Sequence, residues 1–297
     1  MIPDLNNIAI GLITWNGGEY IGRLLESLIK QNYINITIYI LDNQSTDNTI
    51  EVIQKFQSKD NRIQYFVDIK KRDIASAQRY IFKKYLINHR YCMFVCDDDI
   101  YHPDFISNLV PKFEDHEVKL SYCTHNLFNG ANFTLPGDVI KYTNTNSKYY
   151  NSSRFLIFRN CIPIFFGIYK VESLIKSMKY FIMVDSYGFN HENLMIFHFL
   201  LNNKISFTDQ RLFTYFEKER NILYKDRGYK VGINVFYSFI FSIINNFNFS
   251  KIVFSLIISS DLFFLQKIKI ILILAISFLH RTFYKKLLLP IIKSISN

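Results

Sequence analysis

Cysteine is scarce in this sequence. The 297 residues include four cysteines, with no CxxC pair and none of the dense spacing found in small secreted scaffolds. This pattern argues against a disulfide framework as the source of stability. We expect the cysteines to be reduced and mostly buried: they are Cys92, Cys96, Cys123 and Cys161.

The sequence also lacks the usual membrane-targeting signals. The first residues, MIPDLNN, contain an acid and no basic residue, and the apolar run that follows is too short for the core of a signal peptide. The region 251–293 is strongly apolar, yet Asp261, Lys267 and Lys269 interrupt it before about 20 uncharged residues accumulate. We therefore expect a cytoplasmic protein with no spanning helix.

Acidic residues are outnumbered by basic ones. The chain has 25 Asp and Glu against 35 Lys and Arg, which gives a formal net charge of +10. This balance favours anionic partners such as nucleoside diphosphates, nucleic acid or acidic lipid head groups. Hydrophobic residues make up 49% of the chain and aromatic residues 17%, far from the composition of disordered chains. A chain of this length can bury a full core.

Buried-strand patterns alternate with helical patterns through the first hundred residues. The run 8–15 is continuously apolar, as in a buried parallel strand, and residues 21–29 repeat apolar side chains at helical spacing. This alternation predicts an α/β fold with a doubly wound, mostly parallel sheet and ligands beyond the carboxyl ends of its strands. We expect strands at 8–15, 36–41, 63–67 and 91–96, and helices at 21–29, after Ser45 or Thr46, and at 75–86.

Three adjacent acids, Asp97, Asp98 and Asp99, directly follow the fourth expected strand. Their charges repel one another, and a divalent cation is the natural partner that relieves this repulsion. Mn²⁺ and Mg²⁺ suit carboxylate ligands and leave coordination positions open for phosphate oxygens. The alternative is a solvated turn without a metal.

A second polar cluster, residues 42–49, follows the second expected strand. Asp42 lies at the strand end, where its carboxylate can accept hydrogen bonds from a base N–H or a ribose hydroxyl. The small polar residues after it suit a turn and a helix cap, and Ser45 and Asp47 fit that purely structural role. Asp42 is the residue of this cluster that best fits a binding role.

Three motifs in this order and spacing resemble those of glycosyltransferase family 2. They are Thr14-Trp15-Asn16, the segment 42–49 and the segment 96–103, and the match covers roughly the first 110 residues. The resemblance implies a GT-A fold and a nucleotide-sugar donor. It also implies a divalent metal, Mn²⁺ or Mg²⁺, and transfer with inversion.

The resemblance also implies roles for individual residues. Thr14 and Asn16 would lie at the loop that holds the donor nucleotide, Asp42 would hold the nucleoside, and Asp98 would coordinate the metal under the diphosphate.

Further roles concern residues around the acid triplet. Asp97 is expected to contact the donor and Asp99 to support the metal, although the family often has Asp where this chain has Cys96. A basic residue between the third strand and these acids commonly contacts the diphosphate in such enzymes, and Arg72 and Arg79 are the two candidates.

The general base is expected later in the chain, where the family places an acidic pair. Glu192 is our first candidate, with Asp185 and His191 as alternatives. A carboxylate there would take the proton of the acceptor hydroxyl in a single displacement. The structural alternative for Glu192 is an acid that stabilises a helix N-terminus. His191-Glu192 could begin a zinc HExxH motif, but the sequence lacks the second His, so we do not expect a zinc site there.

The chain is expected to divide near residue 215. Residues 1–215 would form the GT-A domain, with a nucleotide-sugar half at about 1–110 and an acceptor half at about 111–215. Residues 216–297 would form a helical extension in which lysines alternate with apolar runs, as in helices at an anionic membrane surface. An ordinary helical subdomain or an oligomer interface is the alternative.

The hypothesis is transfer of a sugar, from a UDP-sugar, to a saccharide or lipid-linked acceptor in bacterial surface polysaccharide or lipopolysaccharide synthesis. The protein would sit on the inner face of the cytoplasmic membrane. A sugar nucleotidyltransferase is the second hypothesis, but the segment 16–19 lacks the basic phosphate loop that it needs. A non-enzymatic membrane or nucleic-acid binding protein is the third. It leaves the acidic clusters unexplained, so we expect no nucleic-acid partner.

Overall fold

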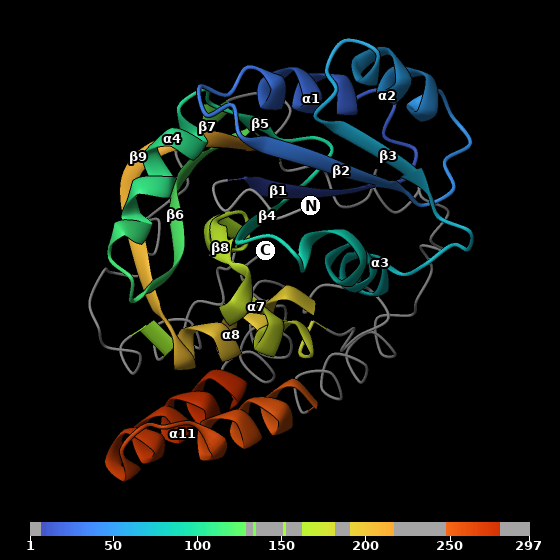
Figure 1. Ribbon diagram of the computed structural model, residues 1–297. Coiled ribbons are helices and arrows are strands. Elements are labelled where there is room, and N and C mark those ends of the chain that lie inside the picture. The colour runs from blue at the N-terminus through green and yellow to red at the C-terminus, as the bar shows by residue number, and fades with distance from the viewer. Residues whose placement is uncertain are drawn as a thin grey trace, which may run out of the picture.

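The computed structural model describes residues 7–128, 133–134, 151–152, 162–181, 191–216 and 248–279. These residues form one curved sheet with helices on both of its faces (Figure 1). The strands are β1 (Ile8–Thr14), β2 (Ile36–Asp42), β3 (Ile63–Val67), β4 (Tyr91–Val95), β5 (Ile100–Tyr101), β6 (Val118–Phe128), β7 (Phe133–Thr134), β8 (Ile168–Lys170) and β9 (Lys204–Phe216).

The helices alternate with the strands in the first part of the chain and become more frequent later. The α-helices are α1 (Ile21–Ile29), α2 (Thr49–Gln57), α3 (Ile74–Ile81), α4 (Phe105–Leu109), α6 (Ile162–Phe165), α7 (Val171–Met178), α8 (His191–Asn202) and α11 (Phe264–Leu279). A π-helical turn, η1 (Phe82–Leu86), continues α3, and a 3₁₀ turn, η2 (Val110–Glu114), continues α4.

The first four strands form a parallel half of the sheet in the order β3-β2-β1-β4. Their continuous apolar sequences match burial on both faces, since α1 and α2 cover one face and α3 the other (Figure 1). The parallel register places Thr14 of β1 beside Asp42 of β2, so both strands end at the same edge. This half confirms the doubly wound sheet that the sequence predicts.

The sheet continues beyond β4 in the order β8-β6-β9-β5. β8 is antiparallel to β4 and to β6, whereas the long strands β6 and β9 are parallel to each other and curl around one side of the molecule (Figure 1). β5 directly follows the acid triplet in the sequence, and it pairs with the C-terminal part of β9. This second half of the sheet therefore contains both parallel and antiparallel strand pairs. Through the β5–β9 pair it reaches the edge at which β1 and β4 end.

The core follows the predicted helical stripe of α1. Ile21, Leu24, Leu25 and Leu28 are fully buried against the sheet, and each buried side chain of this kind contributes about 1.5–3 kcal/mol. The predicted start of the second helix was wrong. α2 begins at Thr49, where the Asp47 side chain accepts from the backbone N–H at 3.1 Å.

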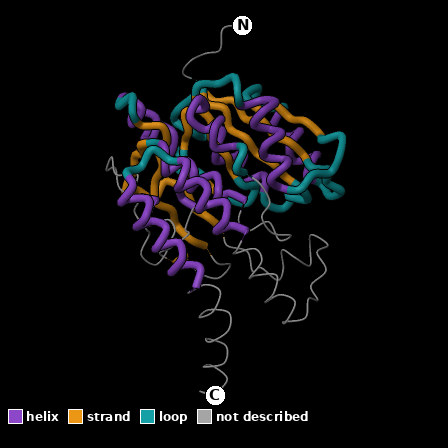
Figure 2. The backbone as a smooth tube through the Cα atoms, turned by 90° about the horizontal axis from the view of Figure 1, so that it is seen from below, coloured by secondary structure: helices purple, strands orange, loops and turns teal. Residues whose placement is uncertain are grey.

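The described part of the C-terminal region consists of a helix at 248–259 followed by α11. The two helices lie side by side below α7 and α8 in Figure 1, and Figure 2 shows them together again from below. None of the helices described is both long enough and apolar enough to cross a membrane. The division of the chain near residue 215 stays a prediction, because residues 217–247 lie outside the described ranges.

Candidate active site

The loops after β1 and β2 are locked together by hydrogen bonds. The Asn16 N–H donates to Ser45 Oγ at 2.8 Å, and the Thr46 N–H donates to Asn16 Oδ1 at 2.8 Å. Asn16 has φ +52° and Gln44 φ +64°, a left-handed backbone that Asn adopts more easily than most residues. Asn16, which the sequence places in the donor-nucleotide loop, therefore holds the two loops in one arrangement.

Asp42 is completely buried at the end of β2. One of its oxygens accepts the Ser45 N–H at 3.0 Å, and the other accepts the Ser45 hydroxyl. Because the Ser45 hydroxyl bonds to Asp42, it does not cap the second helix. Each carboxylate oxygen can accept a second hydrogen bond, so Asp42 keeps acceptor capacity for another donor. The nucleoside role of Asp42 stays a prediction.

Thr14 connects β1 to the acid triplet. Its hydroxyl donates to Asp97 Oδ2 at 2.9 Å, and both residues are buried. Gly17 makes this contact possible, because a Cβ at that position would lie 2.5 Å from both Asp97 Oδ2 and Thr14 Oγ1. The first and third motifs are thus joined directly, and Thr14 acts on Asp97 through this bond.

Asp98 and Asp99 lie with Cys96 in a cluster whose ligand atoms are within 4.8 Å of one another. Asp98 is half-buried, whereas Asp99 is fully buried and accepts the Phe216 N–H at 3.3 Å. Burial, and then the charge of Asp99, raise the pKa of Tyr101 well above its usual value. The two carboxylates suit Mn²⁺ or Mg²⁺, while the softer sulfur of Cys96 was not predicted as a ligand.

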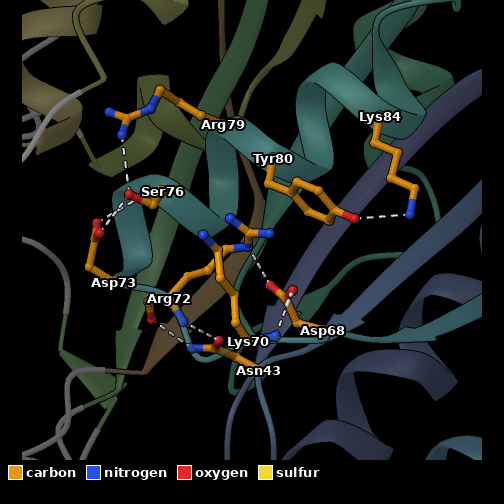
Figure 3. A network of polar contacts seen from close by, with 9 residues as sticks. All are labelled: Asn43, Asp68, Lys70, Arg72, Asp73, Ser76, Arg79, Tyr80 and Lys84. Carbon is orange, nitrogen blue, oxygen red and sulfur yellow. Dashed lines mark hydrogen bonds and ion pairs between the residues drawn. The ribbon is translucent and has the colours of Figure 1, made fainter.

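Arg72 is fixed beside the β2 loop by a network shown in Figure 3. Its Nε donates to Asp68 Oδ2 at 2.6 Å, and its backbone N–H donates to Asn43 Oδ1 at 2.8 Å. The Asn43 amide donates in return to the Arg72 carbonyl at 2.9 Å. The structure therefore brings Arg72 to the loop that contains Asp42. Sequence reasoning missed Asp68, because its role depends on an ion pair that no motif announces.

Arg79 lies on α3 and has different partners. It donates to Ser76 Oγ at 3.2 Å and to the carbonyl of Phe181. Figure 3 shows its guanidinium turned towards Ser76, on the other side of α3 from Asp68. The two predicted arginines are therefore held in separate networks, and Arg72 is the one joined to the β2 loop.

A cation–π contact also connects the loops on the donor side. Trp15 directly follows Thr14 at the end of β1. Lys71 Nζ lies 3.5 Å from the centroid of the Trp15 ring. Such contacts contribute about 0.5–1 kcal/mol when exposed. No sequence pattern predicts this pair, because the two residues are far apart along the chain.

The predicted base candidates lie at the start of α8 or just before it. Glu192 is half-buried in the first turn of this helix, and His191 is its first residue. Asp185 lies outside the described residues, as does the side chain of His191. The choice among these three residues stays a prediction.

Comparisons with known proteins identify the family of this chain. The family model described as Glycosyl transferase family 2 matches residues 9–174. The glycosyltransferase GlyA of Streptococcus pneumoniae is 24% identical over 192 residues, which cover 63% of this chain and 24% of GlyA. Escherichia coli WfaP, a UDP-Glc:alpha-D-GlcNAc-diphosphoundecaprenol beta-1,3-glucosyltransferase, is 31% identical over 130 residues, or 44% of this chain and 49% of WfaP.

Solved structures agree on the fold. The structure of S. aureus TarS 1–349 in complex with UDP-GlcNAc superposes with a TM-score of 0.68 and 19% identity, and the match covers 93% of this chain and 73% of that one. The sheet and this superposition define an α/β protein of the GT-A fold. The chain belongs to glycosyl transferase family 2, whose model matches more than half of it. The match to this chain spans half or less of the length of the two curated relatives named above.

The Thr14–Asp97 bond can be tested through stability. We expect Thr14→Val to lower the free energy of unfolding by about 1–3 kcal/mol, because the buried Asp97 loses a donor. The matched control is Thr37→Val at the other end of the same strand pair, where the hydroxyl donates to Asn7 at 3.2 Å in a less buried setting. Urea unfolding measures both. Equal losses in the two variants would contradict a special role for the Thr14 hydroxyl.

Proposed function

We propose that this protein transfers a sugar from a UDP-sugar to a saccharide or lipid-linked acceptor with inversion at the anomeric carbon. The observation that carries the proposal is the meeting of Asp42, Arg72 and the Asp98–Asp99 pair around the carboxyl edge of β1, β2 and β4. A nucleotide sugar needs acceptors for its nucleoside and positive charge for its diphosphate. The UDP-GlcNAc complex of the TarS structure supports this choice of donor.

The donor would lie across the interlocked loops. Asp42 would accept from the base or the ribose, with Ser45 fixing the direction of its carboxylate. Arg72 would face the diphosphate, its guanidinium oriented by Asp68. Because Arg72 is already held by that ion pair, it pays little conformational entropy on binding.

Asp98 and Asp99 are the residues that would hold Mn²⁺ or Mg²⁺. Their carboxylates fit a hard divalent cation, and half-buried Asp98 leaves access for a ligand. When bound, the cation would supply charge neutralisation for the departing nucleoside diphosphate. Thr14 would keep Asp97 aligned beside this pair.

Glu192 would act as the general base towards the acceptor. Its carboxylate would remove the proton of the acceptor hydroxyl while that oxygen attacks the anomeric carbon from the face opposite the leaving group. Its place in the first turn of α8 puts the carboxylate at the positive end of the helix dipole. Asp185 and His191 are the alternatives if Glu192 serves only the helix.

The C-terminal region would hold the enzyme at the inner face of the cytoplasmic membrane, where lipid-linked acceptors are found. Phe263, Phe264 and Leu265, at the start of α11, are 79%, 76% and 69% exposed. Lys267 and Lys269 follow within the same helix. Exposed aromatic side chains next to lysines suit the interface of an anionic bilayer. The diphosphoundecaprenol acceptor in the name of WfaP supports a lipid-linked substrate.

Nucleotide binding tests the donor site. We expect UDP to bind in the presence of Mn²⁺, to bind weakly in EDTA, and to lose affinity at least roughly tenfold in Asp98→Ala, because ligand loss disrupts the metal site. GDP should bind less tightly than UDP. Glu114→Ala, an exposed acid on η2, is the control and should bind as the wild type does. Calorimetry that detects neither nucleotide with metal would contradict the proposed donor.

Vesicle sedimentation tests the membrane surface. We expect the double variant Phe263→Ser with Phe264→Ser to bind phosphatidylglycerol vesicles at least roughly tenfold more weakly than the wild type, because two apolar anchors are removed. Ile34→Ser, at a side chain that is 74% exposed between α1 and β2, is the control. Unchanged vesicle binding in the double variant would show that α11 does not anchor the protein.

A further inference from the structure

A second polar cavity lies at the opposite edge of the sheet from the acid triplet. This open cavity has a volume of about 450 Å³, and its lining includes Arg90 before β4, Lys119 in β6 and Lys170 at the end of β8, together with the acid Glu172. β4 runs from this cavity towards Asp97, and its five residues span roughly 16 Å. We call this feature the basic cavity, and it is separate from the donor site.

The strand pairing brings these three cations together. Lys170 is opposite Tyr91 across the β4–β8 pair, which places it next to Arg90. Leu120 is opposite Tyr169 across the β6–β8 pair, which places Lys119 beside Lys170 on the β6 side. The strand pairing therefore fixes the Cα positions from which these three charged side chains extend.

Lys170 is an unusual lysine because it is only 6% exposed. Its ammonium donates to the His116 carbonyl at 3.0 Å, and no carboxylate of the described residues lies within 4.0 Å of it. Burial, and then the charge of Lys119, lower its pKa. A buried ammonium without an ion-pair partner normally costs free energy unless another group compensates its charge.

The acids nearby are paired with other lysines, although the charges of Glu172 and Asp115 still raise the pKa of Lys170 against the effect of burial. Glu172 bonds to Lys119 at 2.9 Å. Asp115 and Glu117 both bond to Lys204, at 2.7 and 3.2 Å. Arg90 also has no ion pair with any described residue. Positive charge therefore exceeds negative charge in the basic cavity.

Two further features lie beside the cavity, a histidine ring and a helix N-terminus. His89 lines the cavity, and its Nδ1 is buried without a partner while its Nε2 contacts the Tyr39 hydroxyl at 3.0 Å. α7 begins at the cavity with Lys170 at its N-cap position; no side chain caps it, and its Val171 N–H donates to the Arg90 carbonyl at 3.0 Å. Helix N-termini and cationic side chains together favour phosphate groups.

We propose that the basic cavity binds the phosphoryl group of a small phosphorylated ligand. The volume is larger than one phosphate needs and falls within the range of small-molecule sites, so the ligand carries a further group beyond its phosphate. A soluble phosphate ester and a phospholipid head group share this chemistry. Binding there would neutralise Lys170 and Arg90 at once.

The experiment measures pyrophosphate binding by ³¹P NMR in EDTA, so that no divalent cation is available to the donor site. The variants are Arg90→Gln, which changes an exposed side chain, and Lys170→Met, which keeps the apolar stem of the buried one. We expect each to weaken binding at least roughly tenfold, because a charge-assisted hydrogen bond is lost. Lys112→Gln, an exposed lysine on η2 outside the cavity, is the control and should change little.

A second arm identifies the source of the phosphate. Phosphatidylglycerol vesicles are titrated with Arg90→Gln placed in the Phe263→Ser, Phe264→Ser background, which removes the apolar anchor. A loss with pyrophosphate indicates a soluble ester, and a loss with vesicles alone indicates a head group. Both results support the phosphoryl site.

If Arg90→Gln and Lys170→Met match the wild type in both arms, or if the wild type binds neither probe, the inference is overturned. We expect UDP binding with Mn²⁺ to be unchanged in Arg90→Gln. Failure of the donor proposal and failure of this one are therefore distinguishable.

Discussion

The fold of the donor side depends on the hydrogen bond that joins Thr14 to Asp97. β1 and β4 are neighbours in the parallel half of the sheet, and this bond fixes the ends of both strands relative to each other. Gly17 leaves the room that the bond requires. Asn16 and Asp42, through Ser45, then attach the β2 loop to the same edge. These hydrogen bonds join the ends of β1, β2 and β4 to one another.

The two edges of the sheet gather different charged groups. The carboxyl edge gathers Asp42 with the Asp98–Asp99 pair, and the other edge gathers Arg90 and Lys170. Asp42 and Asp98 share one edge because β2, β1 and β4 are parallel, whereas Lys170 reaches the other edge because β8 is antiparallel to β4. A net charge of +10 alone would not have indicated it.

Much of the parallel half of the fold could be predicted from the sequence. Continuous apolar runs and the helical stripe of α1 located the first four strands and the first helix within one residue, because burial on both faces imposes a strong pattern. The motifs also brought Thr14, Asp42 and Asp98 to one edge. Other features depend on contacts between distant residues, which no local pattern encodes. They are the mixed half of the sheet, the ion pair of Arg72 with Asp68, and the separate place of Arg79.

The most direct test of the central claim is a crystal structure with UDP and Mn²⁺, with the manganese located by anomalous scattering. The account predicts a manganese peak between the carboxylates of Asp98 and Asp99 and the diphosphate, with Asp42 bonded to the nucleoside. The Thr14–Asp97 bond should be unchanged, since the site is organised in advance. UDP bound away from the ends of β1, β2 and β4, or with no manganese at Asp98, would contradict the account.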